Sequence, residues 1–128
     1  MTATPQYSSQ EPSRADVDAM RGPTVLEFGA NWCSICQAAQ PAIASALDAH
    51  RAGAPLQHLK IEDGRGRPLG RSYSVKLWPT LVVLQDGREV ARVVRPGSAA
   101  EITDALARLD TAPAAPAAPS SDAEAMQR

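Results

Sequence analysis

The spacing of hydrophobic and polar residues divides the middle of the chain into short strands and helices. Residues 24–28 are apolar except for Glu27 and follow a Gly-Pro pair, which predicts a short, buried central strand. Between residues 34 and 49, apolar side chains recur at every fourth position, which is helical spacing. We therefore expect a strand followed by a helix, and we expect Pro41 to kink that helix.

The second half of the pattern predicts a hairpin and a final helix. The Asp86-Gly87 pair lies between two β-prone runs and is a strong signal for a tight hairpin turn. Ser98, followed by Glu101 three residues later, forms a capping box at the start of an amphipathic segment. The elements predicted after the first helix are a strand over 56–62, a short helix over 69–75, strands over 80–85 and 89–94, and a helix over 98–109.

This order of elements defines the expected architecture. A strand, a helix and a second strand in succession form a unit in which the two strands are parallel and the crossover is right-handed. The hairpin then adds two antiparallel strands. The fold class is therefore α/β, with a central four-stranded mixed sheet that is flanked by helices on both faces.

Both ends of the chain are predicted to be disordered tails. Residues 1–13 are polar, contain two prolines and have no strand or helix periodicity. Residues 111–128 are rich in proline and alanine and have no means of burying a core. We expect the folded domain over residues 14–110, beginning with a short helical turn at 14–21.

Composition and charge exclude some function classes. A net charge of −1 over 128 residues gives no electrostatic reason to expect nucleic acid or an anionic membrane as a partner. No stretch is apolar and long enough to span a membrane, and the first twenty residues lack the apolar centre of a secretory signal. We therefore expect the protein in the cytoplasm, where thiols are kept reduced.

The candidate chemistry lies in the two cysteines of the chain, Cys33 and Cys36, which are separated by Ser34-Ile35. Cys33 follows the predicted central strand and begins the predicted helix, where unpaired N–H groups and the helix dipole stabilise a thiolate. Cys36 is one turn further along, on the side that faces the domain. We expect Cys33 to attack a substrate disulfide and Cys36 to resolve the mixed disulfide, which yields a Cys33–Cys36 disulfide.

These residues resemble the thioredoxin family. Four features agree: the Trp-Cys-x-x-Cys motif in "FGANWCSIC", a proline five residues after the second cysteine, the hydrophobic-Pro-Thr sequence at residues 78–80, and the Asp-Gly hairpin. The resemblance covers roughly residues 22–110. It implies a thioredoxin-like fold, here with the first strand reduced or absent, and a monomer that needs no bound cofactor and no metal.

The resemblance also implies which residues contact the substrate. These are Trp32 beside the nucleophile and the loop of Trp78, Pro79 and Thr80, in which the Trp78–Pro79 peptide bond is expected to be cis. In the family this loop faces the disulfide, and the residue before the proline pairs its backbone with the substrate peptide. A trans proline at the first residue of an ordinary strand is the alternative.

Glu27 matches a buried aspartate of the family that helps to move the proton of the second cysteine. Burial would raise the pKa of this carboxylate and make it a proton acceptor near neutral pH. The alternative is a solvated glutamate on an open face of the sheet. His58 either pairs with Glu27 or is simply a histidine at a sheet edge.

The chain departs from the family at several positions. Ser34-Ile35 replaces the usual Gly-Pro, and Ile35 offers a thiolate no charge or hydrogen bond, which argues against a strong oxidant. Gly29 stands where the family has an aromatic residue. Trp78 then either narrows the peptide groove and restricts substrates or fills the space left by Gly29.

Two basic features change the expected surface. Arg95-Pro96 replaces a glycine of the family and should alter the far wall of the groove. The loop "DGRGRPLGR" carries three arginines, with Lys76 nearby. These cations form either a patch that steers an acidic partner or a solvated, flexible loop.

The sequence therefore favours a thiol–disulfide oxidoreductase that reduces protein disulfides, with Glu27 handling the proton. Electrons would come from an external donor, for which the family suggests thioredoxin reductase. One alternative is a peptide-binding module on the same scaffold with incidental redox activity. Another is copper handling, although the cysteine pair supplies only two thiolates and neither histidine has ligand spacing to it.

Overall fold

A four-stranded mixed sheet forms the centre of the structure, a computed structural model that describes residues 6–109. The strand order is β2-β1-β3-β4; β1 is parallel to β2 and antiparallel to β3, and β3 is antiparallel to β4. This is the predicted topology. In chain order the elements are α1 (Arg14–Asp18), β1 (Pro23–Gly29), α2 (Ser34–Arg51), β2 (Gln57–Glu62), α3 (Pro68–Ser72), β3 (Thr80–Gln85), β4 (Arg88–Val94) and α4 (Ala99–Leu106).

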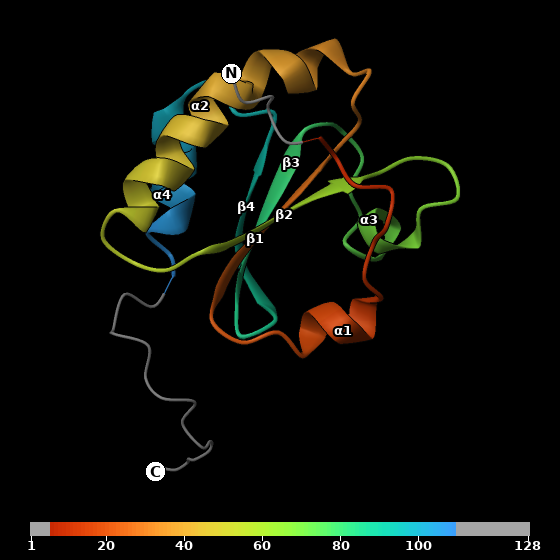
Figure 1. The fold of residues 1–128 in the computed structure, drawn as a ribbon, viewed down its shortest axis with the longest axis horizontal. Coiled ribbons are helices and arrows are strands. Elements are labelled where there is room, and N and C mark those ends of the chain that lie inside the picture. The colour runs from red at the N-terminus through yellow and green to blue at the C-terminus, as the bar shows by residue number, and fades with distance from the viewer. Residues whose placement is uncertain (1–5, 110–128) are drawn as a thin grey trace.

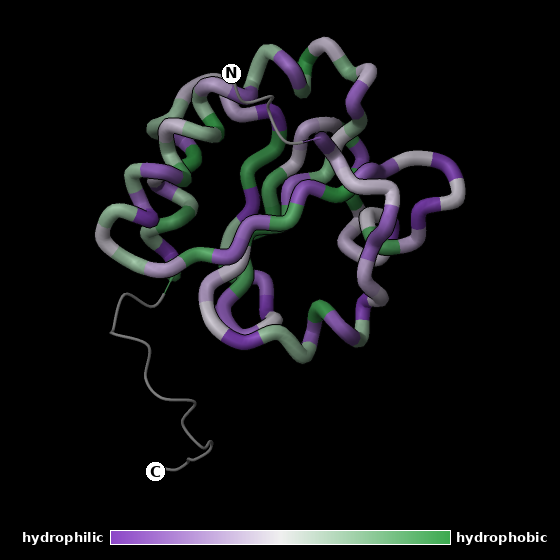
Figure 2. The backbone as a smooth tube through the Cα atoms, in the orientation of Figure 1, coloured by the Kyte–Doolittle hydropathy of each residue, from purple (hydrophilic) through white to green (hydrophobic). Residues whose placement is uncertain are grey.

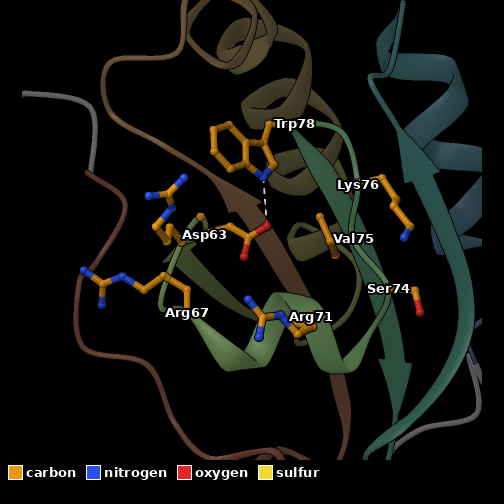
Figure 3. Close-up of a pocket in the computed structure, with 9 residues that line it drawn as sticks. Asp63, Arg67, Arg71, Ser74, Val75, Lys76 and Trp78 are labelled. Carbon is orange, nitrogen blue, oxygen red and sulfur yellow. Dashed lines mark hydrogen bonds between the residues drawn. The ribbon is translucent and has the colours of Figure 1, made fainter.

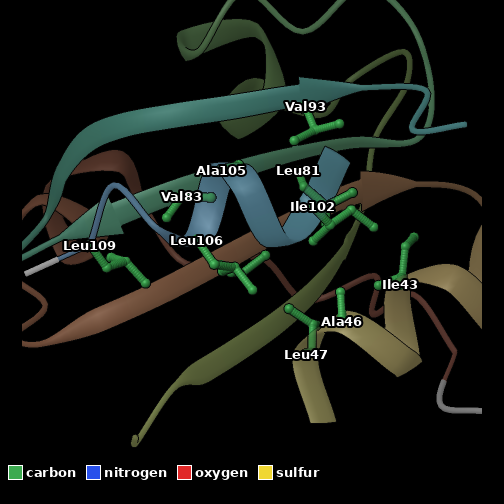
Figure 4. Close-up of a cluster of buried hydrophobic side chains, with 11 residues drawn as sticks. Ile43, Ala46, Leu47, Leu81, Val83, Val93, Ile102, Ala105, Leu106 and Leu109 are labelled. Atoms are coloured by element: carbon green, nitrogen blue, oxygen red, sulfur yellow. The ribbon is translucent and has the colours of Figure 1, made fainter. Parts of the chain in front are cut away.

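Helices cover both faces of this sheet (Figure 1). On one face, α2 and α4 pack against apolar side chains of β1, β3 and β4 (Figure 4). On the other face, α1 and α3 contribute Val17 and Leu69, which pack against Leu26, Phe28 and neighbouring sheet residues. Hydrophobic residues accordingly concentrate along the central strands, whereas the loop after β2 is largely polar (Figure 2). β1 is buried on both faces, which explains its nearly continuous apolar sequence.

Local sequence signals set the ends of most elements. The hairpin turn between β3 and β4 has positive φ at both Asp86 (52°) and Gly87 (81°), the conformation that an Asp-Gly pair favours. Helix α2 continues through Pro41 and changes direction along its length (Figure 1). Helix α4 does begin after Ser98, but the Ser98 side chain makes no capping hydrogen bond, so the predicted capping box is wrong in that detail.

The N-terminal segment is part of the fold, and the predicted domain boundary at residue 14 is too late. Ser8 forms a parallel bridge to Ile61 on the free edge of β2, where its backbone N–H donates to the Lys60 carbonyl and its carbonyl accepts from the Glu62 N–H. Tyr7 is 6% exposed because its ring packs beside Cys36. Among the predicted tails, residues 1–5 and 110–128 lie outside the described residues.

Candidate active site

Strand β1 and helix α2 place the two cysteines together at one end of the sheet. Cys33 is the N-cap residue of α2, and its Sγ accepts a hydrogen bond from the backbone N–H of Cys36 at 3.1 Å. Both thiols are free. Cys33 is 8% exposed and Cys36 is fully buried, so solvent and substrate reach Cys33 first.

The environment of Cys36 keeps its thiol protonated. Burial and the hydrogen bond with Cys33 raise the pKa of Cys36 to about 11, although the backbone of Ala30 and the hydroxyl of Tyr7 act in the opposite direction. A thiol with this pKa must lose its proton as it attacks a disulfide. Cys33 is thus the less deeply buried of the two thiols, and the roles of the pair remain a prediction.

Glu27 lies fully buried on β1 at the centre of a hydrogen-bond network. Its Oε2 accepts hydrogen bonds from the Tyr7 hydroxyl and from Gln40 Nε2, the latter at 2.9 Å. Its Oε1 lies 2.8 Å from His58 Nε2. Lys60 Nζ is 3.9 Å from Oε2 and donates to Gln40 Oε1 at 2.6 Å. Both carboxylate oxygens are therefore paired, and the solvated alternative for Glu27 is wrong.

The direction of the Glu27 pKa differs from the sequence-based expectation. Burial is the largest single influence on this pKa and raises it, as expected. Hydrogen bonds from His58, Gln40 and Tyr7, with the charge of Lys60, act together in the opposite direction and lower the pKa below its ordinary value of 4.5. The carboxylate is therefore ionised at neutral pH, so the proton in the contact with His58 belongs to Nε2.

Tyr7 supplies an aromatic ring to the space beside Gly29. A Cβ atom added at Gly29 would lie 2.6 Å from Tyr7 Cζ and 2.8 Å from both the Tyr7 hydroxyl and Cys36 Sγ. The phenol and the resolving thiol therefore line the same small space. The suggestion that Trp78 fills the space at Gly29 is wrong, because Tyr7 occupies it.

Sequence reasoning missed three members of the network: Tyr7, Gln40 and Lys60. Gln40 follows Cys36 by one helical turn and Lys60 is the register partner of Glu27 on β2, so a full assignment of faces would have found both. His58 is two residues before Lys60 and lies on the same face, and its contact with Glu27 decides between the two interpretations of this histidine. No local signal marks Tyr7, which lies in a polar segment without periodicity.

The predicted substrate loop lies next to the cysteines. The Trp78–Pro79 peptide bond is cis, as the resemblance implied. Trp78 packs against the cluster that contains both cysteines, and its ring meets that of Trp32 edge-on at 5.5 Å. Trp32 is 75% exposed. Thr80 is buried and donates from its hydroxyl to the Leu77 carbonyl at 2.6 Å, so its side chain holds the loop.

Arg95 is hydrogen-bonded to the cis-proline loop. Its backbone N–H donates to the Pro79 carbonyl at 2.8 Å, and its Nε donates to the Trp78 carbonyl at 2.9 Å. The backbone of Arg95 has a φ of 49°, a conformation in which glycine is more usual. Arg95 therefore ties the start of the segment after β4 to the cis-proline loop.

Within residues 6–109, no group of three or more histidine, cysteine, aspartate or glutamate side chains is arranged to hold a metal ion. Over the same range, no helix combines the length and the apolarity needed to cross a membrane.

Comparison with known proteins agrees with this geometry. The structure resembles that of reduced thioredoxin 2 from Pseudomonas aeruginosa PAO1, with a TM-score of 0.71 and 53% identity over 81% of this chain and 94% of that chain. Thioredoxin C-2 of Corynebacterium nephridii is 29% identical over 73% of this chain and 85% of its own length. Thioredoxin H-type 1 of Nicotiana tabacum is 33% identical, but the match spans about half of each protein, 55% of this chain and 53% of the relative.

The family model agrees with these individual matches. The thioredoxin model matches residues 6–108, a range that begins at the N-terminal segment carrying Tyr7 and ends in the segment after α4. The match includes both cysteines, the cis-proline loop and all four strands. By sequence match, fold and paired cysteines, the chain belongs to the thioredoxin family of thiol–disulfide oxidoreductases.

Proposed function

We propose that this protein reduces disulfides in other proteins, with Cys33 as the nucleophile and Cys36 as the resolving thiol. One observation above all supports a protein substrate, namely the position of the exposed apolar side chains. Among residues 6–109, the large hydrophobic side chains that are exposed are Trp32 (75%), Ile35 (44%), Leu77 (45%) and Val94 (45%).

Two of these residues lie next to a cysteine in the chain, and the other two flank the cis-proline loop. Trp32 precedes Cys33, and Ile35 lies between the two cysteines. Leu77 precedes the cis-proline loop, and Val94 is the register partner of Thr80 on the neighbouring strand. An apolar surface that gathers around a reactive group is suited to docking a protein chain. A small hydrophilic disulfide would gain little from it.

The first step is attack by the Cys33 thiolate on one sulfur of the substrate disulfide. A Cys33–substrate disulfide forms, the substrate S–S bond breaks, and the other substrate sulfur leaves as a thiolate that takes up a proton. The N–H groups at the start of α2 stabilise the attacking thiolate.

The second step is attack by Cys36 on Cys33 Sγ. The Cys33–Cys36 disulfide forms and the bond between Cys33 Sγ and the substrate sulfur breaks. The substrate sulfur leaves as a thiolate that takes up a proton from solvent, and Cys36 loses its own proton. We assign the route of this proton to the Tyr7 hydroxyl, which lines the same space as Cys36 Sγ and donates to Glu27 Oε2. The ionised Glu27 accepts charge-assisted hydrogen bonds and holds the phenol in place.

The full reaction transfers two electrons and two protons to the substrate and leaves the protein oxidised. An external two-electron donor of the reductase type must restore the dithiol, and thioredoxin reductase is the donor that we propose. We also propose that the protein acts as a monomer in the cytoplasm, where thiols are kept reduced and the dithiol form is maintained.

The equilibrium reduction potential of the Cys33–Cys36 pair tests this proposal. The protein is equilibrated in thiol redox buffers, its thiols are trapped, and the two forms are counted by mass. A reductase requires a value near or below the glutathione poise of the cytosol, about −220 to −260 mV. A clearly more oxidising value would make the protein an oxidase or isomerase, and a pair that never cycles would leave only a binding module.

A further inference from the structure

A basic pocket adjoins the redox site and shares Trp78 with it. The pocket has a volume of about 580 Å³ and lies between the loop after β2, helix α3 and the segment that leads to Trp78 (Figure 3). Its lining includes the cationic side chains Arg65, Arg67, Arg71 and Lys76. The only carboxylate among its lining residues is Asp63.

The positive charge of this pocket is largely uncompensated. Asp63 Oδ2 accepts a hydrogen bond from Trp78 Nε1 at 2.8 Å (Figure 3). Arg67 is paired with Glu62 at 3.5 Å. The side chains of Arg65, Arg71 and Lys76 are exposed and make no hydrogen bond or ion pair within residues 6–109. Because the whole chain has a net charge of −1, this concentration of cations is a local feature.

Trp78 connects the pocket to the cysteines. The indole packs against the cluster of Tyr7, Ala30, Cys33 and Cys36. It also lies beside Gly64 of the pocket lining, where an added Cβ atom would lie 3.7 Å from the indole ring. A polypeptide bound with its disulfide at Cys33 can therefore continue over Trp78 toward the cations.

We propose that this pocket binds carboxylate side chains that flank the disulfide of a protein substrate, so that the protein prefers acidic substrates. This inference rests on the proposed function, because it requires a polypeptide docked at Cys33. Each solvent-exposed pair of opposite charges changes the affinity for the substrate by up to about fivefold. The combined positive charge of the pocket also speeds the association of an acidic substrate, and added salt weakens this effect.

The test uses two disulfide-cyclised peptides of equal length. One carries four glutamates beside its cysteines and the other carries four glutamines at the same positions. The second-order rate of reduction by the full chain is measured with each peptide at about 20 mM and about 500 mM salt. Two single variants, Arg65→Gln and Arg71→Gln, are compared with a triple variant that combines them with Lys76→Gln. Arg108→Gln is the matched control, because it removes one exposed positive charge from the end of α4.

We expect the Glu peptide to react about five- to tenfold faster than the Gln peptide at low salt and nearly equally at high salt. Arg65→Gln and Arg71→Gln each reduce this advantage by about two- to fivefold, and the triple variant abolishes it. The rate with the Gln peptide changes by less than twofold throughout, and Arg108→Gln preserves the advantage.

Three results would overturn the inference: equal rates for the two peptides at low salt, an advantage that survives in the triple variant, or an equal loss in Arg108→Gln. Charge dependence seen with glutathione disulfide and absent with the peptides would also overturn it, since the pocket would then serve a small disulfide. Failure to reduce either peptide is a different outcome, because it contradicts the proposed function itself.

Discussion

Replacing Tyr7 by phenylalanine tests whether the N-terminal segment is part of the catalytic site. The substitution removes the hydroxyl that donates to Glu27 Oε2 and keeps the ring that fills the space at Gly29. Because the lost hydrogen bond ends on a buried, ionised carboxylate, we expect the free energy of unfolding to fall by about 1.5–3 kcal/mol. The pKa of Glu27 should rise, since the Tyr7 hydrogen bond is one of the contacts that lower it.

The same substitution should slow resolution and leave the first attack unchanged. Reduced protein is mixed in a stopped-flow instrument with an excess of an aromatic disulfide whose thiolate absorbs visible light. Attack by Cys33 releases one thiolate in a phase that depends on reagent concentration, and attack by Cys36 releases the second in a phase that does not. We expect Tyr7→Phe to slow the second phase at least tenfold, because the substitution removes the hydroxyl to which we assign the proton of Cys36.

Tyr73→Phe is the matched control for this experiment. Tyr73 is also buried, but its hydroxyl has no hydrogen-bond partner among the described residues, so its removal should change stability and both phases little. The reasoning is refuted if Tyr7→Phe leaves the second phase unchanged, slows both phases equally, or behaves like Tyr73→Phe.

Two further substitutions test the buried network. The pKa of Glu27 is lower in the folded protein than its ordinary value of 4.5, so its contribution to stability is complete above about pH 4.5 and is lost as the pH falls through the folded value. Glu27→Gln should therefore lower the free energy of unfolding by about 1–3 kcal/mol at pH 7, and it should make the loss of stability in acid less steep. Denaturant unfolding between pH 7 and pH 3 measures both effects. A variant that is more stable than the parent at pH 7 would mean that the cost of burying the Glu27 charge exceeds the gain from its hydrogen bonds. Gly29→Ala would place a methyl group 2.6 Å from Tyr7 Cζ and should cost about 1–3 kcal/mol. Gly53→Ala, whose added carbon would meet nothing closer than 4.0 Å, should be nearly neutral, and equal effects of the two substitutions would argue against the packing of Tyr7.

The sequence was sufficient for features that depend on neighbouring residues. Short apolar, β-prone runs predicted every strand of the sheet to within one residue at each end. The Asp86-Gly87 pair predicted the hairpin, and the position of Cys33 after a strand predicted its place at the start of α2. These features follow from periodicity, turn chemistry and helix termini, which are local properties of the chain.

Features that depend on contacts between distant segments were not predictable in the same way. Tyr7 reaches Glu27 only because Ser8 adds to the edge of β2, and nothing in the polar sequence around Tyr7 indicates this. The direction of the Glu27 pKa depends on the balance between burial and several hydrogen bonds. Burial was evident from the apolar strand, but the number of donors required the folded structure.

The most direct test of the central claim is to trap the mixed disulfide with single-cysteine variants. Cys36→Ser and Cys33→Ser are each reduced and mixed with a protein that contains an accessible disulfide, and the products are analysed by mass under non-reducing conditions. The account predicts that Cys36→Ser accumulates a covalent complex through Cys33, which a reductant releases, and that Cys33→Ser forms none. A complex that forms equally well through Cys36, or that fails to form through Cys33, would contradict it.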